Sequence, residues 1–298
     1  MITYNPQGLI IMKLLFFILS LIPKSLFSYL VDIYLFCKIY KFNSSYKITK
    51  INLKIAYPES TKSQIELLSK LSIRESIISG FETIYTWGRK AFDANKNIFR
   101  VENNFLLTFH SKQNKGLIVV AFHNRSVDML LRWINSQVET TSLYKKIKIR
   151  ILNDFVKRNR ESNGSKTFET TIGGVREMLK ALNEKKVTVF AADQVPKRGL
   201  GEHINFFNRK AYTTTLVQSL ATKTLAPVIY AYINSNPKNF LSLTIKSCNS
   251  NIYEDSKHKL LLNYDIENMI NERPIDYSWE YKRFRRSKDI KGDPYKDI

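Results

Sequence analysis

The sequence predicts an α/β fold with a central mixed sheet flanked by helices, preceded by an N-terminal membrane-anchoring helix and a helical segment. Short apolar runs typical of buried strands alternate with segments of helical periodicity, and a long apolar stretch stands at the N-terminus. The chain has 298 residues, 44% of them apolar, which is enough for one large domain with a sizeable core. No repeat or Pro/Gly/Ser-rich linker interrupts it, so we expect an anchor over residues 1–41 and one domain over residues 42–298.

The N-terminal stretch from Leu9 to Tyr40 consists mostly of Leu, Ile, Phe and Tyr. Its longest charge-free run, residues 14–23, is shorter than the ~20 apolar residues that span a bilayer core. A span over residues 14–36 would contain Lys24 and Asp32, which lie eight positions apart and share one face of a helix. We therefore expect membrane attachment, and whether the segment spans the bilayer or lies in it stays open. A buried core helix is the alternative.

The residues around this stretch predict a cytoplasmic position for the rest of the chain. Basic residues are more numerous after it than before it, where Lys13 stands alone. The residues from Ser28 to Tyr34 form a poor cleavage site for a signal peptide, so we expect the segment to be retained. Cys37 and Cys248 are too few and too far apart for a disulfide framework or a cysteine zinc site. This cysteine usage is typical of a reducing compartment.

Helical and strand-like segments then alternate along the domain. From Thr61 the apolar positions recur mainly three, four and seven apart, with Thr61 and Gln64 spaced as a capping box, which predicts a long amphipathic helix. Buried strands are expected over residues 117–122, 187–191, 227–233 and 241–245, and helices over residues 126–133, 148–160 and 174–182. In such sheets, chemistry gathers at the carboxyl ends of the strands.

The charge balance favours an anionic partner. Lys and Arg number 47 against 26 Asp and Glu, which leaves a net charge of +21. Phospholipid headgroups, nucleic acid and an acidic protein all fit this charge, but no helix-turn-helix, zinc-finger or RNP-like segment supports nucleic-acid binding. Most of the lysines form a solvated face. Arg158 and Arg160, near a predicted helix end, are better candidates because a planar guanidinium binds phosphate or carboxylate through two bonds.

His123 is the first candidate for chemistry, because it follows the predicted strand over residues 117–122 directly. Asp128 comes five residues later, in the expected first turn of the next helix. We expect its carboxylate to hydrogen-bond one ring nitrogen of His123, which leaves the other nitrogen free to take a proton from a hydroxyl. A loop histidine beside a helix-start carboxylate without any catalytic role is the alternative.

Asp193 and Gln194 follow the predicted strand over residues 187–191 in the same manner, although a turn residue at a strand end gives the same pattern. The tract over residues 197–201 lacks the spacing of a P-loop or a dinucleotide fingerprint, so we expect no nucleotide cofactor. His203 and His258 have no partner at a metal-ligand spacing, and we therefore expect no metal site.

Several short motifs follow the apolar N-terminus in a definite order. They are Asn52 to Glu59, His123 to Asp128, Arg158 to Glu161, Gly174 to Arg176, Asp193-Gln194, Asn205 to Thr215, and Trp279 to Phe284. This order resembles the lipid A biosynthesis (lauroyl/myristoyl) acyltransferase family, in the lysophospholipid acyltransferase superfamily, with its His-x4-Asp/Glu, Arg-x-Arg and Trp-x-x-x-Arg-Phe motifs. Two departures are Arg125-Ser126-Val127-Asp128 in place of Gly-Asn-Trp-Glu, and Asn208 in place of Gly.

The resemblance implies transfer of a fatty acyl chain from acyl-acyl carrier protein, or acyl-CoA, to a hydroxyl of a lipid A-type glycolipid at the cytoplasmic face of the inner membrane. His123 would act as the base and Asp128 would orient it. Arg160 would hold a phosphate or the developing oxyanion, and Asp193 would shape the acceptor site. The implied partners are the carrier protein, the glycolipid and an anionic membrane. We expect a monomer that needs no metal or organic cofactor, since the thioester already carries the activation.

Two rival functions stay open. One is acyl transfer to glycerol phosphate lipids, although the Phe-Pro-Glu-Gly motif common in such enzymes lies downstream of the histidine, whereas the similar residues 57–60 here lie upstream. The other is a non-catalytic basic membrane tether.

Overall fold

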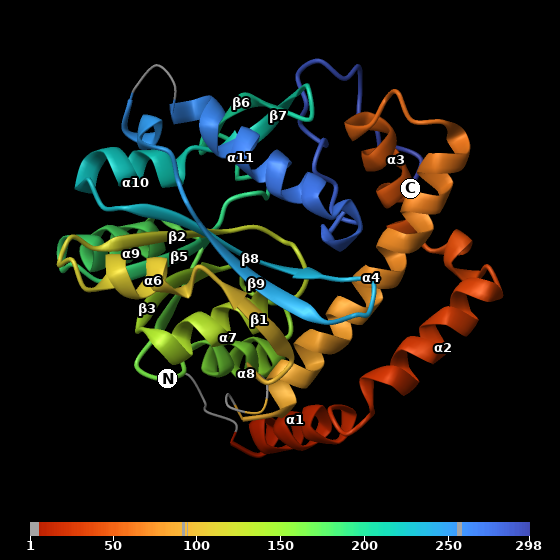
Figure 1. Cartoon of the computed structure of the whole chain (residues 1–298), viewed down its shortest axis with the longest axis horizontal. Helices are drawn as coiled ribbons and strands as arrows, with labels where there is room; N and C mark the ends of the chain where they lie inside the picture. Colours follow the sequence, from red (N-terminus) through yellow and green to blue (C-terminus); the bar gives the residue numbers. More distant parts are fainter. Residues whose placement is uncertain (1–5, 91–92, 94, 255–257) are drawn as a thin grey trace.

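The computed structural model describes residues 6–90, 93, 95–254 and 258–298. A seven-stranded sheet in the order β1-β9-β8-β2-β5-β3-β4 forms its centre (Figure 1). Neighbouring strands are parallel except β8 and β9, which confirms the expected mixed sheet. The strands are β1 (Ile98–Glu102), β2 (Leu117–Ala121), β3 (Thr140–Tyr144), β4 (Lys166–Glu169), β5 (Val187–Ala191), β8 (Val228–Ser235) and β9 (Leu241–Ser247).

Helices cover both faces of this sheet, because the side chains of β2 alternate between two apolar clusters. Ile118 and Val120 pack with α9 (Ile172–Asn183), α10 (Leu216–Thr224) and α11 (His258–Glu272). Leu117 and Val119 pack on the opposite face with α6 (Asn104–Ser111) and α7 (Val127–Gln137). A strand that is apolar on both sides is therefore fully buried, as its sequence predicts.

The predicted strands and helices of the domain are present. The helix predicted from Thr61 is α4 (Lys62–Gly88), and the capping box of Thr61 with Gln64 is formed. The helix predicted over residues 148–160 is α8 (Arg150–Arg160). The sequence did not single out β3 and β4, whose polar residues mask the strand pattern; the buried hydroxyls of Ser142 and Thr167 satisfy each other across these strands at 3.2 Å.

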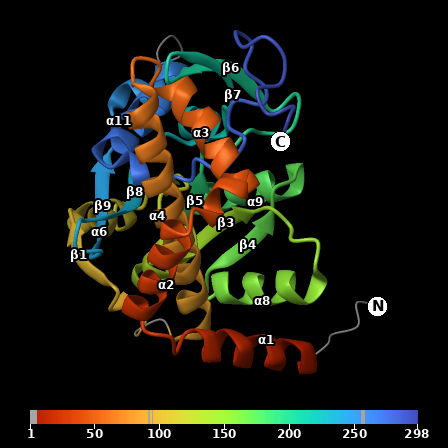
Figure 2. The ribbon, with the colours of Figure 1, turned by 90° about the vertical axis from the view of Figure 1, so that its right-hand side faces the viewer.

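The N-terminal segment differs from the single anchoring helix that we expected. It forms α1 (Pro6–Leu19) and α2 (Lys24–Phe36), because the chain turns at Pro23 and the two helix axes bend by 80°. No single helix in the described part of the chain is long and apolar enough to cross a bilayer, whereas this bent pair reaches the required length and composition together. Both helices pack along α4, and α1 also contacts α8 (Figure 2).

The remaining elements close the domain around the sheet. They are η1 (Ile39–Phe42), α3 (Ser44–Ala56), the hairpin of β6 (Gly201–Phe206) and β7 (Arg209–Thr214), η2 (Ser250–Tyr253) and η3 (Pro274–Asp276). The C-terminal segment then returns to α3, where the side-chain amide of Asn52 donates to the carbonyls of Trp279 (2.6 Å) and Tyr281 (2.8 Å). This return brings residues 276–281 beside the carboxyl end of β2.

Candidate active site

The candidate active site lies where β2 and β5 end. These neighbouring strands are parallel, and Ala121 is paired with Ala191. His123 and Asp193 each stand two residues beyond that pair, so the strand register places them side by side. The two sequence candidates at strand ends therefore belong to one site.

Asp193 binds His123 twice. The ring Nδ1 of His123 lies 2.8 Å from Oδ1 of Asp193, and the main-chain N–H of His123 donates to Oδ2 at 3.1 Å. The Nε2 atom faces the side-chain amide nitrogen of Gln194 at 3.0 Å. These contacts match a ring that donates from Nδ1 and accepts at Nε2, the form that takes up a proton. The His123 side chain is 31% exposed and that of Asp193 is 2% exposed, so the pair opens to solvent on the histidine side.

The pKa values of the pair shift in opposite directions. Burial lowers the pKa of His123, but the charge of Asp193 and the hydrogen bond to it outweigh burial and raise that pKa above its usual value. Burial raises the pKa of Asp193, while the interactions with His123 lower it below the usual range on balance. Each group therefore favours the charged form of the other: the carboxylate favours protonation of the ring, and the ring favours the ionised carboxylate.

The expected hydrogen bond between Asp128 and His123 is replaced by a different pairing. Both carboxylate oxygens of Asp128 accept from Arg160, from Nε at 2.7 Å and from the second terminal nitrogen at 2.9 Å. Asp128 lies in the first turn of α7 and meets the C-terminal turn of α8, whereas Asp193 arrives from the adjacent strand. The spacing of five residues suggested the wrong carboxylate because it ignored the strand pairing.

The two predicted arginines have different environments. The Arg160 side chain is 22% exposed and lies close enough to His123 that its charge opposes protonation of the ring. Arg158 is exposed, and two positions along a helix correspond to about 200° of rotation, so it lies on another side of α8. The structure brings Arg160, Asp128, His123, Asp193 and Gln194 into one region and leaves Arg158 outside it.

A family model described as bacterial lipid A biosynthesis acyltransferase matches residues 7–286, nearly the whole chain. The chain belongs to this family. It is therefore an acyltransferase, and the sequence resemblance is confirmed. No curated protein matches the chain.

The structure adds residues of this acyltransferase that the sequence did not single out as site residues. Tyr277 is buried beside Asp193, and burial followed by that negative charge raises the pKa of its hydroxyl well above the usual value. Glu280 lies near His123; burial raises its pKa, and its Oε1 accepts from Ser76 at 2.7 Å. Both follow η3, far from residue 123 in sequence, and lie within or next to the Trp279 to Phe284 motif. That motif is the one signal that pointed to this segment.

The C-terminal segment also fixes the backbone of the loop between β2 and α7, residues 122–126, which we call the His123 loop. The carbonyl of His123 accepts from the N–H of Ser278 at 2.9 Å, and the N–H of Arg125 donates to the carbonyl of Asp276 at 3.0 Å. Arg125 has a φ of 56°, a left-handed conformation that glycine adopts without strain. Arg125 stands at the first position of the Gly-Asn-Trp-Glu departure described above, where the sequence has arginine in place of glycine.

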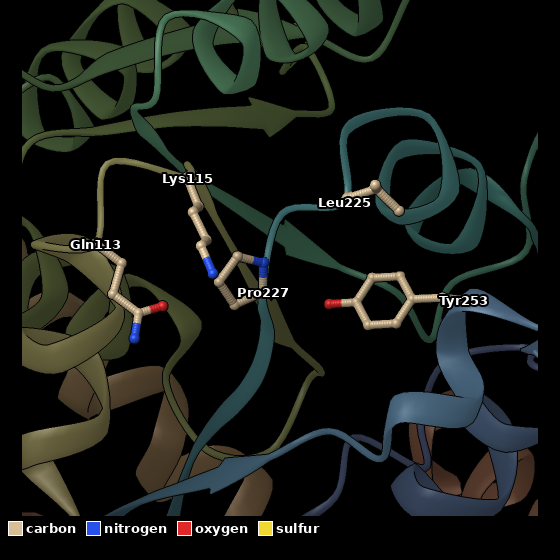
Figure 3. A pocket seen from close by; sticks show the side chains of 5 residues that line it. All are labelled: Gln113, Lys115, Leu225, Pro227 and Tyr253. Atoms are coloured by element: carbon tan, nitrogen blue, oxygen red, sulfur yellow. The ribbon is translucent and has the colours of Figure 1, made fainter.

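An open pocket of about 240 Å³ lies near the amino ends of β2 and β8, at the other end of these strands from His123 (Figure 3). Its lining residues include Lys115, which precedes β2, and Pro227, which precedes β8. The amino ends of parallel strands lie at the edge opposite their carboxyl ends, where His123 is found. This pocket is therefore separate from the candidate active site.

Proposed function

We propose that this acyltransferase moves a fatty acyl chain from acyl-acyl carrier protein, or acyl-CoA, to a hydroxyl of a lipid A-type glycolipid. The single observation that supports the mechanism is the Asp193–His123 pair, with Nδ1 bound to the carboxylate at 2.8 Å and Nε2 directed away from it. This is the arrangement of a general base whose tautomer is fixed by a buried carboxylate.

The reaction follows from that arrangement. The Nε2 atom of His123 takes the proton of the acceptor hydroxyl, in the position where the amide of Gln194 now lies. The hydroxyl oxygen attacks the thioester carbonyl and forms a tetrahedral intermediate. Its collapse forms the ester and breaks the carbon–sulfur bond, and the imidazolium returns the proton to the leaving thiolate. Asp193 stabilises the imidazolium while it exists, and such base catalysis contributes ~10²–10⁴-fold.

Arg160 has the role of an anion-binding group in this proposal. Asp128 binds Arg160 through two parallel hydrogen bonds, which holds the guanidinium plane in one orientation. The N–H groups of Arg160 that Asp128 does not bind are the ones that hold a phosphate of the acceptor or the oxyanion of the intermediate. Asp128 then acts through Arg160 rather than on His123. Arg158, which is exposed, has no contact role in this mechanism.

Attachment to the cytoplasmic face of the inner membrane completes the proposal. The exposed large apolar side chains of α1 and α2 include Ile10, Leu14, Ile18, Leu26, Leu30 and Phe36. Such a face gains free energy by entering the interfacial region of a bilayer. The net charge of +21 favours both anionic lipid and an acidic carrier protein.

Two experiments test the function. Mass spectrometry of lipids from cells with and without the protein reports the acceptor and the chain length together, and we expect a lipid A-type glycolipid that lacks one acyl chain when the protein is absent. An altered set of glycerol phosphate lipids instead would overturn the acceptor. In purified enzyme, His123→Ala must abolish transfer while the protein stays folded, and activity like that of the unchanged enzyme would refute the mechanism.

A further inference from the structure

Helix α2 carries two charged residues, Lys24 and Asp32, and α4 binds both. The Nζ of Lys24 lies 2.8 Å from Oε1 of Glu82. Asp32, two turns further along α2, accepts from Nε of Arg74 at 2.6 Å and from a terminal nitrogen of the same arginine at 3.2 Å. The charges that share a face in the sequence are therefore directed at the protein, while the opposite face of α2 is apolar and exposed.

Both of these interactions continue to a single guanidinium. Glu82 accepts from Arg125, and Arg74 binds Oε1 of Glu75 at 2.8 Å while Oε2 of Glu75 accepts from Arg125. We call this set of six residues the α2 clamp, and it runs in the order Lys24, Glu82, Arg125, Glu75, Arg74, Asp32. The two end members of the clamp, Lys24 and Asp32, both belong to α2.

The centre of the clamp belongs to the His123 loop. The Arg125 side chain is 0% exposed and also lies 3.3 Å from Oδ1 of Asp276, in the segment that binds the backbone of this loop. Its left-handed φ of 56° costs free energy for any residue but glycine. The ion pairs offset that cost, so the side chain of Arg125 and not its backbone preference explains why an arginine stands here.

Apolar packing is incomplete at the first end of the clamp. A cavity of about 260 Å³ lies between the turn that leads into α2 and helix α4, and Lys24 and Glu82 both line it. The ion pair therefore borders a space that side chains do not fill, so it is a polar contact between the start of α2 and α4 where apolar packing is incomplete.

We propose that Arg125 is a positioning residue for acyl transfer and that the α2 clamp ties the orientation of His123 to the seating of α2 on the bilayer. This inference rests on the proposed function for its catalytic readout. Removal of Arg125, Glu75 or Glu82 takes partners from buried charges, and removal of Lys24 or Asp32 takes one of the two partners from Glu82 or Arg74. Either change shifts Arg125, and with it the His123 loop. The apolar outer face of α2 is the surface that lipid contacts, and the clamp is the path from that surface to the site.

The first test cuts the outer ends of the clamp, where folding is least at risk because both side chains are partly exposed. We expect the double variant Lys24→Met, Asp32→Asn to bind vesicles of phosphatidylglycerol and phosphatidylcholine as the unchanged protein does. Its kcat on these vesicles should fall by about tenfold, because a small misplacement of a catalytic group is costly, with the KM for the acyl donor unchanged. A kcat within twofold of the unchanged enzyme overturns the proposal.

The second test cuts the centre and does not depend on acyl transfer. Imidazole ¹⁵N and ¹H NMR is practicable because the chain has four histidines. We expect Arg125→Lys and Glu82→Gln to weaken or shift the Nδ1–H signal of the hydrogen bond from His123 to Asp193. Glu66→Gln is the matched control, since Glu66 also lies on α4 and pairs with Lys50 at 2.9 Å outside the clamp. An unchanged His123 signal in folded Arg125→Lys protein overturns the proposal; if that variant does not fold, Glu82→Gln and the outer double variant decide it.

If the unchanged protein transfers no acyl chain, the proposed function fails while the NMR comparison still reports whether the clamp orients His123. If transfer occurs and neither set of variants alters kcat or the His123 signal, the clamp fails and the proposed function stands.

Discussion

One carboxylate, that of Asp193, binds both the ring and the backbone of His123. Its Oδ1 lies 2.8 Å from the ring Nδ1 and its Oδ2 accepts the main-chain N–H at 3.1 Å. The same group therefore fixes the tautomer, the ring orientation and the backbone at residue 123. Asp193 is 2% exposed, so this double contact is shielded from water and is correspondingly strong.

Replacing this carboxylate should damage catalysis more than replacing the one that the sequence favoured. We expect Asp193→Asn to lower kcat on the order of 10²–10⁴-fold, because the ring loses both its tautomer preference and the charge that stabilises the imidazolium. Asp128→Asn should lower kcat less, since it disturbs Arg160 and leaves His123 bound. Steady-state kinetics of the two folded variants, checked by circular dichroism, decide the order. A larger loss in Asp128→Asn would return Asp128 to the role of partner of His123.

The pH dependence of transfer follows from the raised pKa of His123. The base must be neutral, so activity falls as the pH drops through that pKa, and this fall begins at a higher pH than an ordinary histidine would give. In Asp193→Asn the two largest raising interactions, the charge of Asp193 and its hydrogen bond, are gone, and burial, which lowers the pKa, outweighs the remaining charge of Glu280. The acid limb of the kcat/KM profile should therefore move to lower pH even though the maximum is reduced. An unmoved limb would show that another group controls the profile.

Arg160→Lys should separate geometry from charge at the anion site. Lysine keeps the positive charge but does not reproduce the two parallel bonds to Asp128, so we expect the KM for the acceptor to rise by about tenfold or more. Arg158→Lys is the matched control on the same helix and should leave kcat and the KM for the acceptor unchanged. Equal effects of the two substitutions would remove Arg160 from the site.

Asn52 is a motif residue whose role is structural. Its amide donates to the carbonyls of Trp279 and Tyr281, and its oxygen accepts from the hydroxyl of Tyr295. Asn52→Ala leaves these buried groups without partners, which should lower the free energy of unfolding by about 2–4 kcal/mol. Urea denaturation measures the loss. A change below about 0.5 kcal/mol would mean that water replaces the amide without cost.

Membrane binding should depend on the outer face of α2. Leu30 is 53% exposed and Phe36 is 84% exposed, and their transfer into a bilayer interface contributes free energy that serine does not supply. We expect Leu30→Ser, Phe36→Ser to bind anionic vesicles at least tenfold more weakly, as measured by vesicle sedimentation. Leu71→Ser on α4, at 36% exposure, is the matched control away from α2. Equal binding by both variants would argue against α2 as the lipid contact.

The predicted strands over residues 117–122 and 187–191 were recognisable because both faces of each strand are apolar, a property that the sequence displays directly. The helix that begins after Thr61 was recognisable because its capping box and the spacing of its apolar residues are also local features of the sequence. Lys24 and Asp32 were predicted to share a face, and both do face α4. The sequence did not predict that α1 and α2 meet at an angle of 80° around Pro23, because the direction of α2 depends on its packing against α4.

The sequence by itself determined the α/β class, the strand ends that carry His123 and Asp193, and the family of the chain. Only the tertiary structure decided which carboxylate meets the imidazole and which charges meet Arg125. The reason is that strand and helix patterns repeat over a few residues, whereas His123 and Asp193 are separated by 70 positions and Arg125 and Asp276 by 151. Contacts across such separations are set by the register between strands and the return path of the C-terminal segment, neither of which has a local signal.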